Sequence, residues 1–527
     1  MKSSHVFVLL WLSFSHVALS TLATDDAAAL KKVWQALAGN ALYWKGTDVR
    51  VKPCNAADFT GVACGSGTYS IVLSRTLVTG GPLDPAIGSL GPRLLSLTAQ
   101  AINLNGQLPL SICNLTNLNQ LTISGNPSLG GVIPSCLTSL TALTSLTLSN
   151  NKLTGGIPSD ISSLYNLKTL ILGFNVLNGT IPNMSTMTNL TSLDVGYNWL
   201  INTNNVVSLP SSLLSLILTN CSISQPLMGL LNNTISLQKF NGAYNHWSGT
   251  ISGISSLVNL TIFSCRVCSL SGSMSEISSL ALLGNLDINT NSFAGVVPPL
   301  NLSFLTSLNL GFNNLGGILP PSIFFQPMLS TLDISSNNFT SIGFDSSHVS
   351  LTSTLATFSA PGNKYLTGSI PLLVGNYTKL TSMDLSFTLA TDTAPPYPPS
   401  MPVLNSLTLS GTAVSSFPAV LNNVTSLTSI TINNIFTVVN SSMYQVAHPN
   451  LRTLTLYANG IAGSTVDISR CPSLATLEIT TCTNIVSIHP SNLQSQSLTT
   501  LRLSGNKIAS FDPTATVGSS SLTSIDL

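Results

Sequence analysis

Apolar residues recur along this chain at a spacing that predicts a repeated strand and turn. In residues 118–126 (LNQLTISGN), apolar side chains stand at positions 1, 4 and 6, and Asn stands at position 9. Positions 4 and 6 are two apart, so a short strand would point both side chains to the same side. The residues between them would face solvent. The pattern therefore predicts short strands that bury their leucines only against neighbouring strands.

The same unit is found along most of the chain. Its first residues lie at 94, 118, 143, 167, 190, 213, 237, 257, 283, 305, 329, 355, 380, 404, 427, 451, 474, 498 and 522. The mean period is about 24, inside the range of leucine-rich repeats. Stacked turns of this kind form a parallel sheet. The predicted fold class is an α/β solenoid, a leucine-rich repeat superhelix with a concave parallel β-sheet, about 19 repeats of about 24 residues and an amino-terminal helical cap.

The ninth position of the repeat is expected to hold the turn together. Most repeats place Asn there, whose amide can both donate to and accept from backbone groups. Cys221, Cys265 and Cys482 stand there in three repeats, and Thr388 and Thr412 in two. A thiol or a hydroxyl meets only part of the demand that an amide meets, so we expect weaker hydrogen bonding in those turns.

The other half of several repeats carries a second consensus. Residues 129–134, 153–158 and 177–182 read L-x-G-x-I/V/L-P, in which Gly permits unusual backbone geometry and Pro ends strand pairing. This half resembles the plant-type leucine-rich repeat proteins, which include the ectodomains of receptor-like kinases and receptor-like proteins and the secreted hydrolase inhibitors. The resemblance covers residues 25–527. It implies an extracellular peptide, protein or glycan as partner, with a co-receptor as a further partner.

The segment before the repeats resembles the amino-terminal cap of that family. Asp25 or Asp26 can cap a helix that carries Leu30, Val33, Trp34 and Leu37 on one stripe. The following Cys54 and the run from Phe59 to Cys64 look like the family's C-x-W-x-G-V-x-C motif, with Phe59 where the family has Trp. The resemblance implies a disulfide between Cys54 and Cys64 and a cap that shields the first leucines from water.

The ends of the chain suggest where it acts. Lys2, the apolar run from Val6 to Phe14 and the small residue Ser20 are typical of a secretory signal peptide. We therefore divide the chain into a signal peptide (1–20), a cap (21–70), plant-type repeats (71–380) and more divergent repeats (381–527). The last repeat stops at Leu527 without a polar cap, so we expect a longer gene product.

Charge is scarce, which excludes some partners. Charged residues make up 7% of the chain and the formal net charge is +1, which falls to zero once Lys2 is removed. Such a chain has no global field to attract nucleic acid. Polar residues interrupt every later apolar stretch, so we expect no membrane span after the signal peptide.

The nine cysteines belong to an oxidising compartment if the chain is secreted. Cys113 and Cys136 fall on the convex halves of successive repeats, where they form either a disulfide or two buried thiols. Cys265 and Cys268 form a C-x-x-C, but no second pair or suitably spaced histidine accompanies it. We expect no metal site and no cofactor.

Sequons are frequent and favour a glycoprotein. They lie at Asn114, Asn178, Asn183, Asn189, Asn220, Asn232, Asn259, Asn301, Asn338, Asn376, Asn423 and Asn440. The repeat itself generates some of them, because four sit four residues before a first leucine. Asn220 and Asn259 are expected at outward strand positions, where sugars would crowd the concave face.

Two rows of side chains are candidates for ligand binding on the concave face. The fifth repeat position carries acids, at Asp194, Asp287, Asp333, Asp384, Glu478 and Asp526. They would attract a cationic partner, unless Asp is simply ordinary at this position. The eighth position carries aromatic residues, at Phe174, Tyr197, Tyr244, Phe312 and Phe387. These would anchor a peptide or stack on sugars, unless they only pack over neighbouring turns.

Motifs of enzymes are absent from the sequence. There is no G-x-S-x-G, H-E-x-x-H or P-loop, and the histidines are scattered. We therefore expect no catalytic residues and predict an extracellular recognition module, receptor-like, that binds through the concave face. The alternatives are a complete secreted binder similar to the inhibitors of cell-wall-degrading hydrolases, and a structural matrix or wall protein.

Overall fold

The computed structural model consists of two compact units, Met1–Thr203 and Asn204–Leu527. It describes residues 24–37, 62–64, 68–73, 80–200, 207–369, 375–391, 400–413, 424–433, 448–457, 465–466, 471–482, 487–488, 497–506 and 522–526. The predicted signal peptide and the predicted Cys54–Cys64 disulfide lie outside the described residues.

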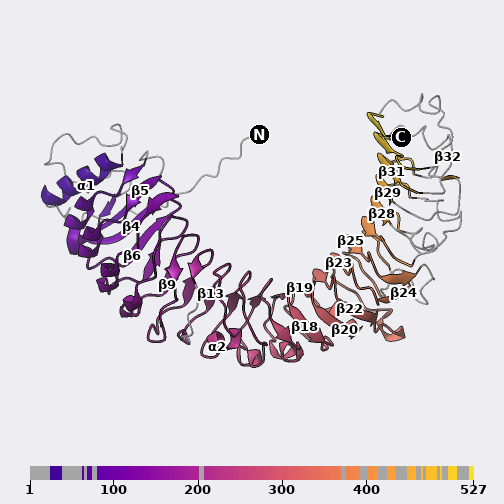
Figure 1. Ribbon diagram of the computed structural model, residues 1–527, viewed down its shortest axis with the longest axis horizontal. Coiled ribbons are helices and arrows are strands. Elements are labelled where there is room, and N and C mark those ends of the chain that lie inside the picture. The colour runs from indigo at the N-terminus through magenta and orange to yellow at the C-terminus, as the bar shows by residue number, and fades with distance from the viewer. Residues whose placement is uncertain are drawn as a thin grey trace, which may run out of the picture. The chain divides into compact units, whose positions relative to one another are not determined.

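Unit 1 is a cap followed by stacked turns. Its main sheet consists of β1 (Val62–Cys64), β2 (Tyr69–Leu73), β4 (Leu94–Gln100), β6 (Gln120–Ser124), β8 (Ser145–Thr147), β9 (Thr169–Ile171) and β11 (Ser192–Asp194). β1 is antiparallel to β2, and all the others pair in parallel. Figure 1 shows these strands in indigo and violet, side by side along one side of the unit.

The other side of unit 1 carries short 3-10 helices and a second set of strand pairs. The helices are η1 (Pro85–Arg93), η2 (Leu110–Asn114), η3 (Ser135–Ser139) and η4 (Ser159–Ser163), and the strands are β3 (Gly81–Pro82), β5 (Leu104–Gln107), β7 (Ser128–Gly130), β10 (Asn178–Gly179) and β12 (Trp199–Leu200). β3 pairs with β5, β5 with β7, and β10 with β12, all in parallel. The L-x-G-x-I-P half of the repeat therefore forms this side.

Unit 2 continues the same architecture with a longer main sheet. Its strands are β13 (Ser215–Ile217), β14 (Lys239–Asn241), β15 (Ile262–Ser264), β17 (Asn285–Asp287), β19 (Ser307–Asn309), β21 (Thr331–Asp333), β23 (Thr357–Ser359), β25 (Ser382–Asp384), β27 (Ser406–Thr408), β28 (Ser429–Asn433), β29 (Thr453–Tyr457), β31 (Thr476–Thr480), β33 (Thr500–Arg502) and β34 (Ser524–Asp526). Each pairs in parallel with the next. We call the solvent-facing side of these strands, in either unit, the strand face.

The opposite side of unit 2 holds the remaining elements. The helices are α2 (Leu227–Leu231), η5 (Ile254–Ser256), η6 (Ser275–Ser279), η7 (Pro321–Phe325) and η8 (Ser346–His348). The strands are β16 (Ser271–Gly272), β18 (Ser292–Gly295), β20 (Asn314–Leu319), β22 (Asn338–Ile342), β24 (Thr367–Ser369), β26 (Leu389–Thr391), β30 (Thr465–Val466) and β32 (Ser487–Ile488). The predicted fold, a leucine-rich repeat superhelix with a parallel sheet, is confirmed.

The core is built as the repeat predicts. Position-4 leucines such as Leu146, Leu170 and Leu193 have no exposed surface and lie beside each other in register on adjacent strands. A fully buried leucine contributes about 1.5–3 kcal/mol relative to an exposed one. Each turn gains this only when its neighbours cover it.

The ninth-position Asn acts as expected. Asn175 is buried and donates from Nδ2 to the carbonyls of Leu148 and Leu172, both at 2.9 Å, while its Oδ1 accepts the N–H of Leu153 at 3.0 Å. It therefore bonds both its own turn and the preceding one. Thr388 donates a single hydrogen bond, to Leu385 within its own turn, so the hydroxyl meets part of the same demand.

One predicted repeat start is wrong by three residues. Phe263 pairs with Phe240, which is position 4 of its own repeat, so the repeat placed at 257 begins at Leu260. Cys265 is therefore at position 6 and Cys268 at position 9. Leu257 instead precedes the strand, in the turn after η5, where it is fully buried.

The cap helix α1 (Thr24–Ala36) buries Leu30 and Val33 as predicted, and Leu37, which follows the helix directly, is also buried. The predicted Trp34 side chain lies outside the described part of the structure. Because the helix begins at Thr24, neither Asp25 nor Asp26 is its N-cap. Asp26 is fully buried, forms an ion pair with Arg93 and accepts a hydrogen bond from the Tyr69 hydroxyl at 3.2 Å. This pairing joins the helix to η1 and β2.

Candidate functional site

The fifth-position acids lie on the strand face, but four of them accept a hydrogen bond from the backbone of their own turn. Asp194 accepts the N–H of Gly196 at 2.9 Å, and Asp287 accepts that of Asn289 at 3.1 Å. Asp333 and Asp384 accept from Ser335 and Ser386 in the same way, each at 2.9 Å. Each side chain thus caps the end of its strand.

Neutral residues perform the same task in other repeats. Asn241 accepts the N–H of Ala243 and Asn309 that of Gly311, both at 3.2 Å. The position therefore requires a hydrogen-bond acceptor, and it does not require a charge.

Burial raises the pKa of the Asp287 carboxyl above its ordinary value, while the hydrogen bond from Asn289 and the charge of Arg266 act in the opposite direction. Burial likewise raises the pKa of Asp194.

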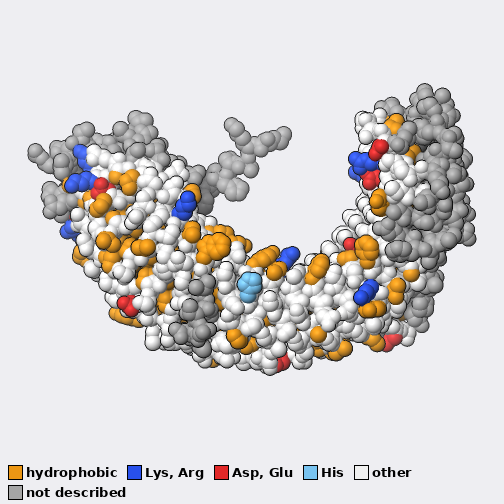
Figure 2. Space-filling view, in the orientation of Figure 1, with side chains coloured by type: hydrophobic (Ala, Val, Ile, Leu, Met, Phe, Trp, Pro, Cys, Tyr) orange, Lys and Arg blue, Asp and Glu red, His pale blue; other side chains and the backbone are white. Residues whose placement is uncertain are grey.

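The other two acids of the row lie near a cation. Glu478 forms an ion pair with Arg502, and Asp526 is the register partner of Arg502 on the next strand. A cationic ligand would meet less negative potential there than the sequence suggests, because Arg502 partly neutralises the pair. Figure 2 shows how sparse charged side chains are over the drawn surface.

The eighth-position aromatic residues are half exposed. Tyr244, Phe312 and Phe387 have 48, 55 and 52% of their surface exposed. In unit 1, Phe174 and Tyr197 stack on each other with ring centroids 4.2 Å apart. Phe174 and Tyr197 therefore pack over neighbouring turns, which was the alternative to ligand binding for this row. Among the described residues, Tyr244 and Phe312 have no ring contact of this kind.

All five aromatic residues hold a left-handed backbone conformation, with φ between 53 and 58°. The eighth position requires it throughout, since Asn150, Ser336 and Gly362 there also have positive φ. Glycine is the residue that adopts this conformation without cost. The rings therefore stand at a position where the backbone disfavours them.

Arg266 is one of the basic residues on the strand face of unit 2. It stands at position 7 of the turn before Asp287, and its charge opposes the rise that burial causes in the pKa of that carboxyl. We define the central face as Tyr244, Arg266, Asp287, Phe312 and Asp333, on the turns from β14 to β21. It offers rings, one cation and two carboxylates on five consecutive turns.

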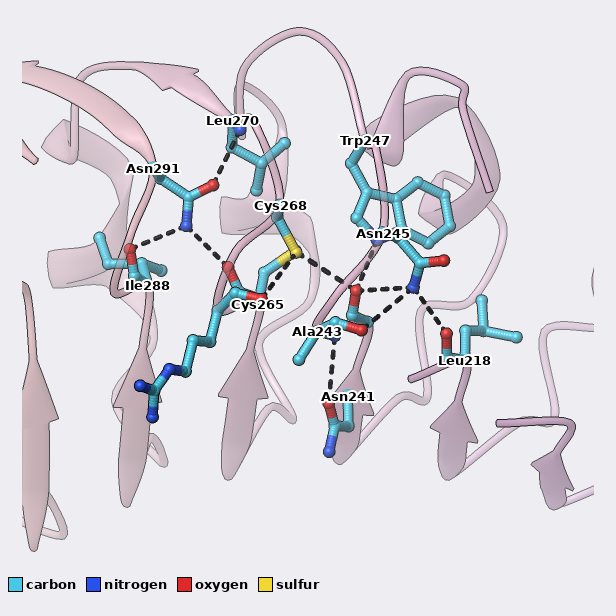
Figure 3. Close-up of a disulfide and its surroundings, with 12 residues drawn as sticks. Leu218, Asn241, Ala243, Asn245, Trp247, Cys265, Cys268, Leu270, Ile288 and Asn291 are labelled. Carbon is cyan, nitrogen blue, oxygen red and sulfur yellow. Dashed lines mark hydrogen bonds between the residues drawn. A yellow bond between two sulfur atoms is a disulfide. The ribbon is translucent and has the colours of Figure 1, made fainter. Parts of the chain in front are cut away.

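Beneath the central face lies a disulfide that the sequence analysis did not anticipate. Cys265 and Cys268 are bonded to each other and fully buried (Figure 3). Cys268 occupies the ninth position, where Asn in other repeats bonds the preceding turn. Its Sγ lies 3.2 Å from the carbonyl oxygen of Gly242, but a disulfide sulfur has no proton to donate.

Trp247 supplies the missing donor. Its indole Nε1 donates to the Gly242 carbonyl at 2.7 Å, and Asn245 Nδ2 donates to the same oxygen at 3.0 Å (Figure 3). Trp247 stands at position 11, where Leu153, Leu177 and Leu200 stand in other repeats. The absence of Asn at position 9 thus coincides with an indole donor one turn earlier.

The other described cysteines form one disulfide or are buried. Cys113 and Cys136 form a disulfide between η2 and η3, with an S–S distance of 2.00 Å. Cys221, Cys471 and Cys482 are buried thiols. The C-x-x-C motif is therefore a disulfide. Among the described residues, no group of three or more His, Cys, Asp or Glu side chains could hold a metal ion.

The described sequons differ in how their amides are used. Asn189 Nδ2 donates to Tyr165 O at 2.9 Å and Asn259 Nδ2 to Ile235 O at 3.2 Å, so both side chains join successive turns. Asn259 precedes β15, which corrects its expected outward strand position. Asn220 is exposed at position 8 of its repeat, after β13 has ended, so its expected outward strand position is corrected too. Asn423 and Asn440 lie outside the described residues.

A row of threonine hydroxyls was missed by the sequence analysis. At the second repeat position, Thr Oγ1 donates to the second-position carbonyl of the preceding turn at 2.8–3.1 Å, as seen at Thr144, Thr191, Thr261, Thr306, Thr381, Thr428, Thr499 and Thr523. The recurrence of Thr two residues before the position-4 leucine was the available signal. This row strengthens the stack along one edge of the strand face.

Comparisons with known proteins agree with this architecture. The Leucine Rich Repeat family model matches residues 142–164 and 304–325. A curated relative, Receptor-like protein 35 of Arabidopsis thaliana, is 33% identical over 109 residues, which is 20% of this chain and 11% of that protein. The matched segment thus spans about a tenth of that relative's length.

Solved structures show the same fold. The plant peptide hormone receptor RGFR1 in complex with RGF2 is similar with a TM-score of 0.66 and 23% identity, over 85% of this chain and 72% of that one. The Arabidopsis receptor kinase HAESA, in complex with the peptide hormone IDA and the co-receptor SERK1, is similar with a TM-score of 0.58 and 22% identity, over 94% of this chain and 98% of that one. In the described part of the chain, no helix is long and apolar enough to span a membrane. The chain thus has the fold of a leucine-rich repeat superhelix, and it is similar in part of its sequence to a plant receptor-like protein.

Proposed function

We propose that the protein is an extracellular recognition module that binds a peptide or protein segment through the central face. The observation that carries this proposal is the presence of half-exposed rings at Tyr244 and Phe312, in a backbone conformation that disfavours them. The signal-like residues 1–20 support a location outside the cell.

Folding gives no reason for those rings. A left-handed backbone costs a residue with a β-carbon roughly 1–2 kcal/mol, and glycine would avoid that cost, as at Gly362 and Gly411. The exposed ring of Phe312 recovers little of it, because more than half of its surface stays in water. Residues that cost stability and stay exposed are typical of binding sites. Aromatic side chains are also enriched among the residues that dominate binding energy.

The charges of the central face indicate the chemistry of the ligand. Asp287 and Asp333 present carboxylates on two turns that are separated by the turn of Asn309, and Arg266 presents a guanidinium on the turn before Asp287. A ligand with an apolar side chain for the rings and a basic group for the carboxylates would complement this surface. RGFR1 and HAESA, which share the fold, are both seen in complexes with peptide hormones, and HAESA also with a co-receptor. These complexes support a peptide as the class of ligand.

The repeat itself supplies clean variants for the test. Phe312→Asn and Tyr244→Asn introduce the residue that stands at this position in Asn150 and Asn220, both of which have positive φ. Neither change creates a sequon. Peptides selected from a displayed random library against the wild-type protein would be measured by calorimetry against each variant.

We expect each ring variant to bind a selected peptide at least about tenfold more weakly, the effect of about 1.4 kcal/mol. The melting temperature should stay the same or rise, because the backbone is relieved of strain. Phe174→Asn in unit 1 is the matched control and should leave binding unchanged. Selected peptides that bind both ring variants as tightly as the wild type would refute the central face as the binding site.

A further inference from the structure

Unit 1 carries an exposed aromatic surface that its own packing does not explain. Trp199 on β12 has 65% of its surface exposed, and Val176 on the preceding turn has 40%. Beside them, at the eighth position of the same two turns, lie the stacked rings of Phe174 and Tyr197. Large apolar side chains clustered in this way usually lie under something.

A sequon stands directly beside the indole. Asn178 on β10 is the register partner of Trp199 on β12, in a parallel pair. Register partners in a sheet project to the same face with β-carbons roughly 5 Å apart. Val176, two residues before Asn178, is exposed like Asn178, whereas Leu177 between them is buried. The Asn178 side chain is therefore flanked by Trp199 on one side and by Val176 on another.

The amide of Asn178 is available for modification. Its side chain is exposed, and within the part of the chain that the structure describes it makes no hydrogen bond. Asn189 and Asn259 differ, because each uses Nδ2 to bond the carbonyl of the preceding turn. A sugar on either of those would have to displace or distort a contact between repeats. A sugar on Asn178 would disturb none.

We propose that Asn178 carries an N-linked glycan whose first sugar packs on the indole of Trp199. During synthesis Nδ2 of Asn178 would attack C1 of an oligosaccharide held on a lipid diphosphate. The N–C1 bond forms, the C1–O bond to the diphosphate breaks, the lipid diphosphate leaves, and the amide proton passes to a base of the transferase.

The stacking follows from the chemistry of the two partners. The C–H face of a pyranose is apolar, and it packs on the face of an indole ring. The glycan therefore covers the ring that the fold leaves exposed, and this lateral surface of unit 1 is shielded from protein partners. The inference rests on the secretory location given under the proposed function, since only that route supplies the donor.

The test combines site occupancy with the accessibility of Trp199. The full chain would be produced in a glycosylating secretory host, once with its own residues 1–20 and once with a foreign leader in their place. Occupancy at each sequon would be read by glycopeptide mass spectrometry. Because the chain has five tryptophans, the acrylamide quenching of Trp199 is taken as the difference between each protein and its Trp199→Phe counterpart.

We expect Asn178 to be occupied, and quenching of Trp199 to rise about twofold in Asn178→Gln, since a sugar covers one of the two faces of the ring. Asn232→Gln, which removes an exposed sequon at the end of α2, should leave it unchanged. A bare Asn178 in a chain whose other sequons are occupied would overturn the inference. So would equal quenching with and without the glycan. Failure of export with residues 1–20 alone, while the foreign leader restores it, would instead count against the proposed location.

Discussion

Trp247 offers the sharpest test of how a turn without Asn is held together. The indole donates to the buried carbonyl of Gly242 at 2.7 Å, the oxygen that an Asn at position 268 would otherwise reach. In Trp247→Phe this hydrogen bond is lost, although Asn245 still donates to the same oxygen at 3.0 Å. The variant therefore isolates one donor without leaving the oxygen bare.

The expected cost has two parts. Loss of the hydrogen bond contributes only about 1 kcal/mol, because Asn245 still donates to the same carbonyl oxygen. The smaller ring leaves a gap beside Phe240, whose ring centroid lies 6.4 Å from that of Trp247, and this adds about 1 kcal/mol. The free energy of unfolding should fall by about 2 kcal/mol in total.

A second background separates the two parts. In Cys265→Leu/Cys268→Asn, position 6 carries Leu and position 9 carries Asn, as at Leu310 and Asn313. The introduced side-chain amide can then donate to the Gly242 carbonyl, so Trp247→Phe should lose only the packing contribution. Urea unfolding followed by circular dichroism avoids the change in tryptophan fluorescence. A cost that is equal in both backgrounds, within the roughly 0.5 kcal/mol expected for independent sites, would refute the idea that the indole replaces the amide.

Three further predictions concern other parts of the chain. Asp287→Asn keeps the acceptor for Asn289 and removes a carboxyl whose pKa burial raises. A raised pKa stabilises the fold below the unfolded pKa of about 3.9, and that stability is lost as the pH rises through the folded value. The variant should therefore melt higher than the wild type at pH 7 and equally at pH 3; an equal melting temperature at pH 7 would contradict this. Cys113→Ser/Cys136→Ser removes a cross-link with a sequence separation of 23 and should cost about 3 kcal/mol, measured by calorimetry of the variant against the oxidised wild type. A variant as stable as the oxidised wild type would contradict the expectation. Asp26→Asn breaks a buried ion pair whose arginine is 40% exposed; chemical denaturation should show a loss of at most about 3 kcal/mol, and no loss would mean that the pairing contributes nothing to the cap.

The sequence predicted the core and turn residues that every repeat requires. It failed where two positions fit the same repeat consensus. Leu146 and Asn175 follow from spacing alone, because a buried strand allows only one inward set of side chains. Leu257 and Leu260 both fit as the first leucine of their repeat, and only the pairing of Phe263 with Phe240 decides between them. The disulfide at Cys265 depended on that register. Hydrogen bonding of the fifth-position acids could have been suspected, since Asn241 and Asn309 stand at the same position.

These cases separate the two candidate rows of the strand face. A residue is evidence of function to the extent that the repeat does not require it. Asp333 satisfies the fifth position, which requires an acceptor, so its presence is explained by the turn that it caps. Phe312 does not satisfy the eighth position, which favours glycine, and more than half of its surface remains exposed. The ring therefore provides the stronger evidence for a ligand. Substitution of Phe312 should weaken binding more than neutralisation of Asp333, whose contribution is charge alone and falls as salt is raised.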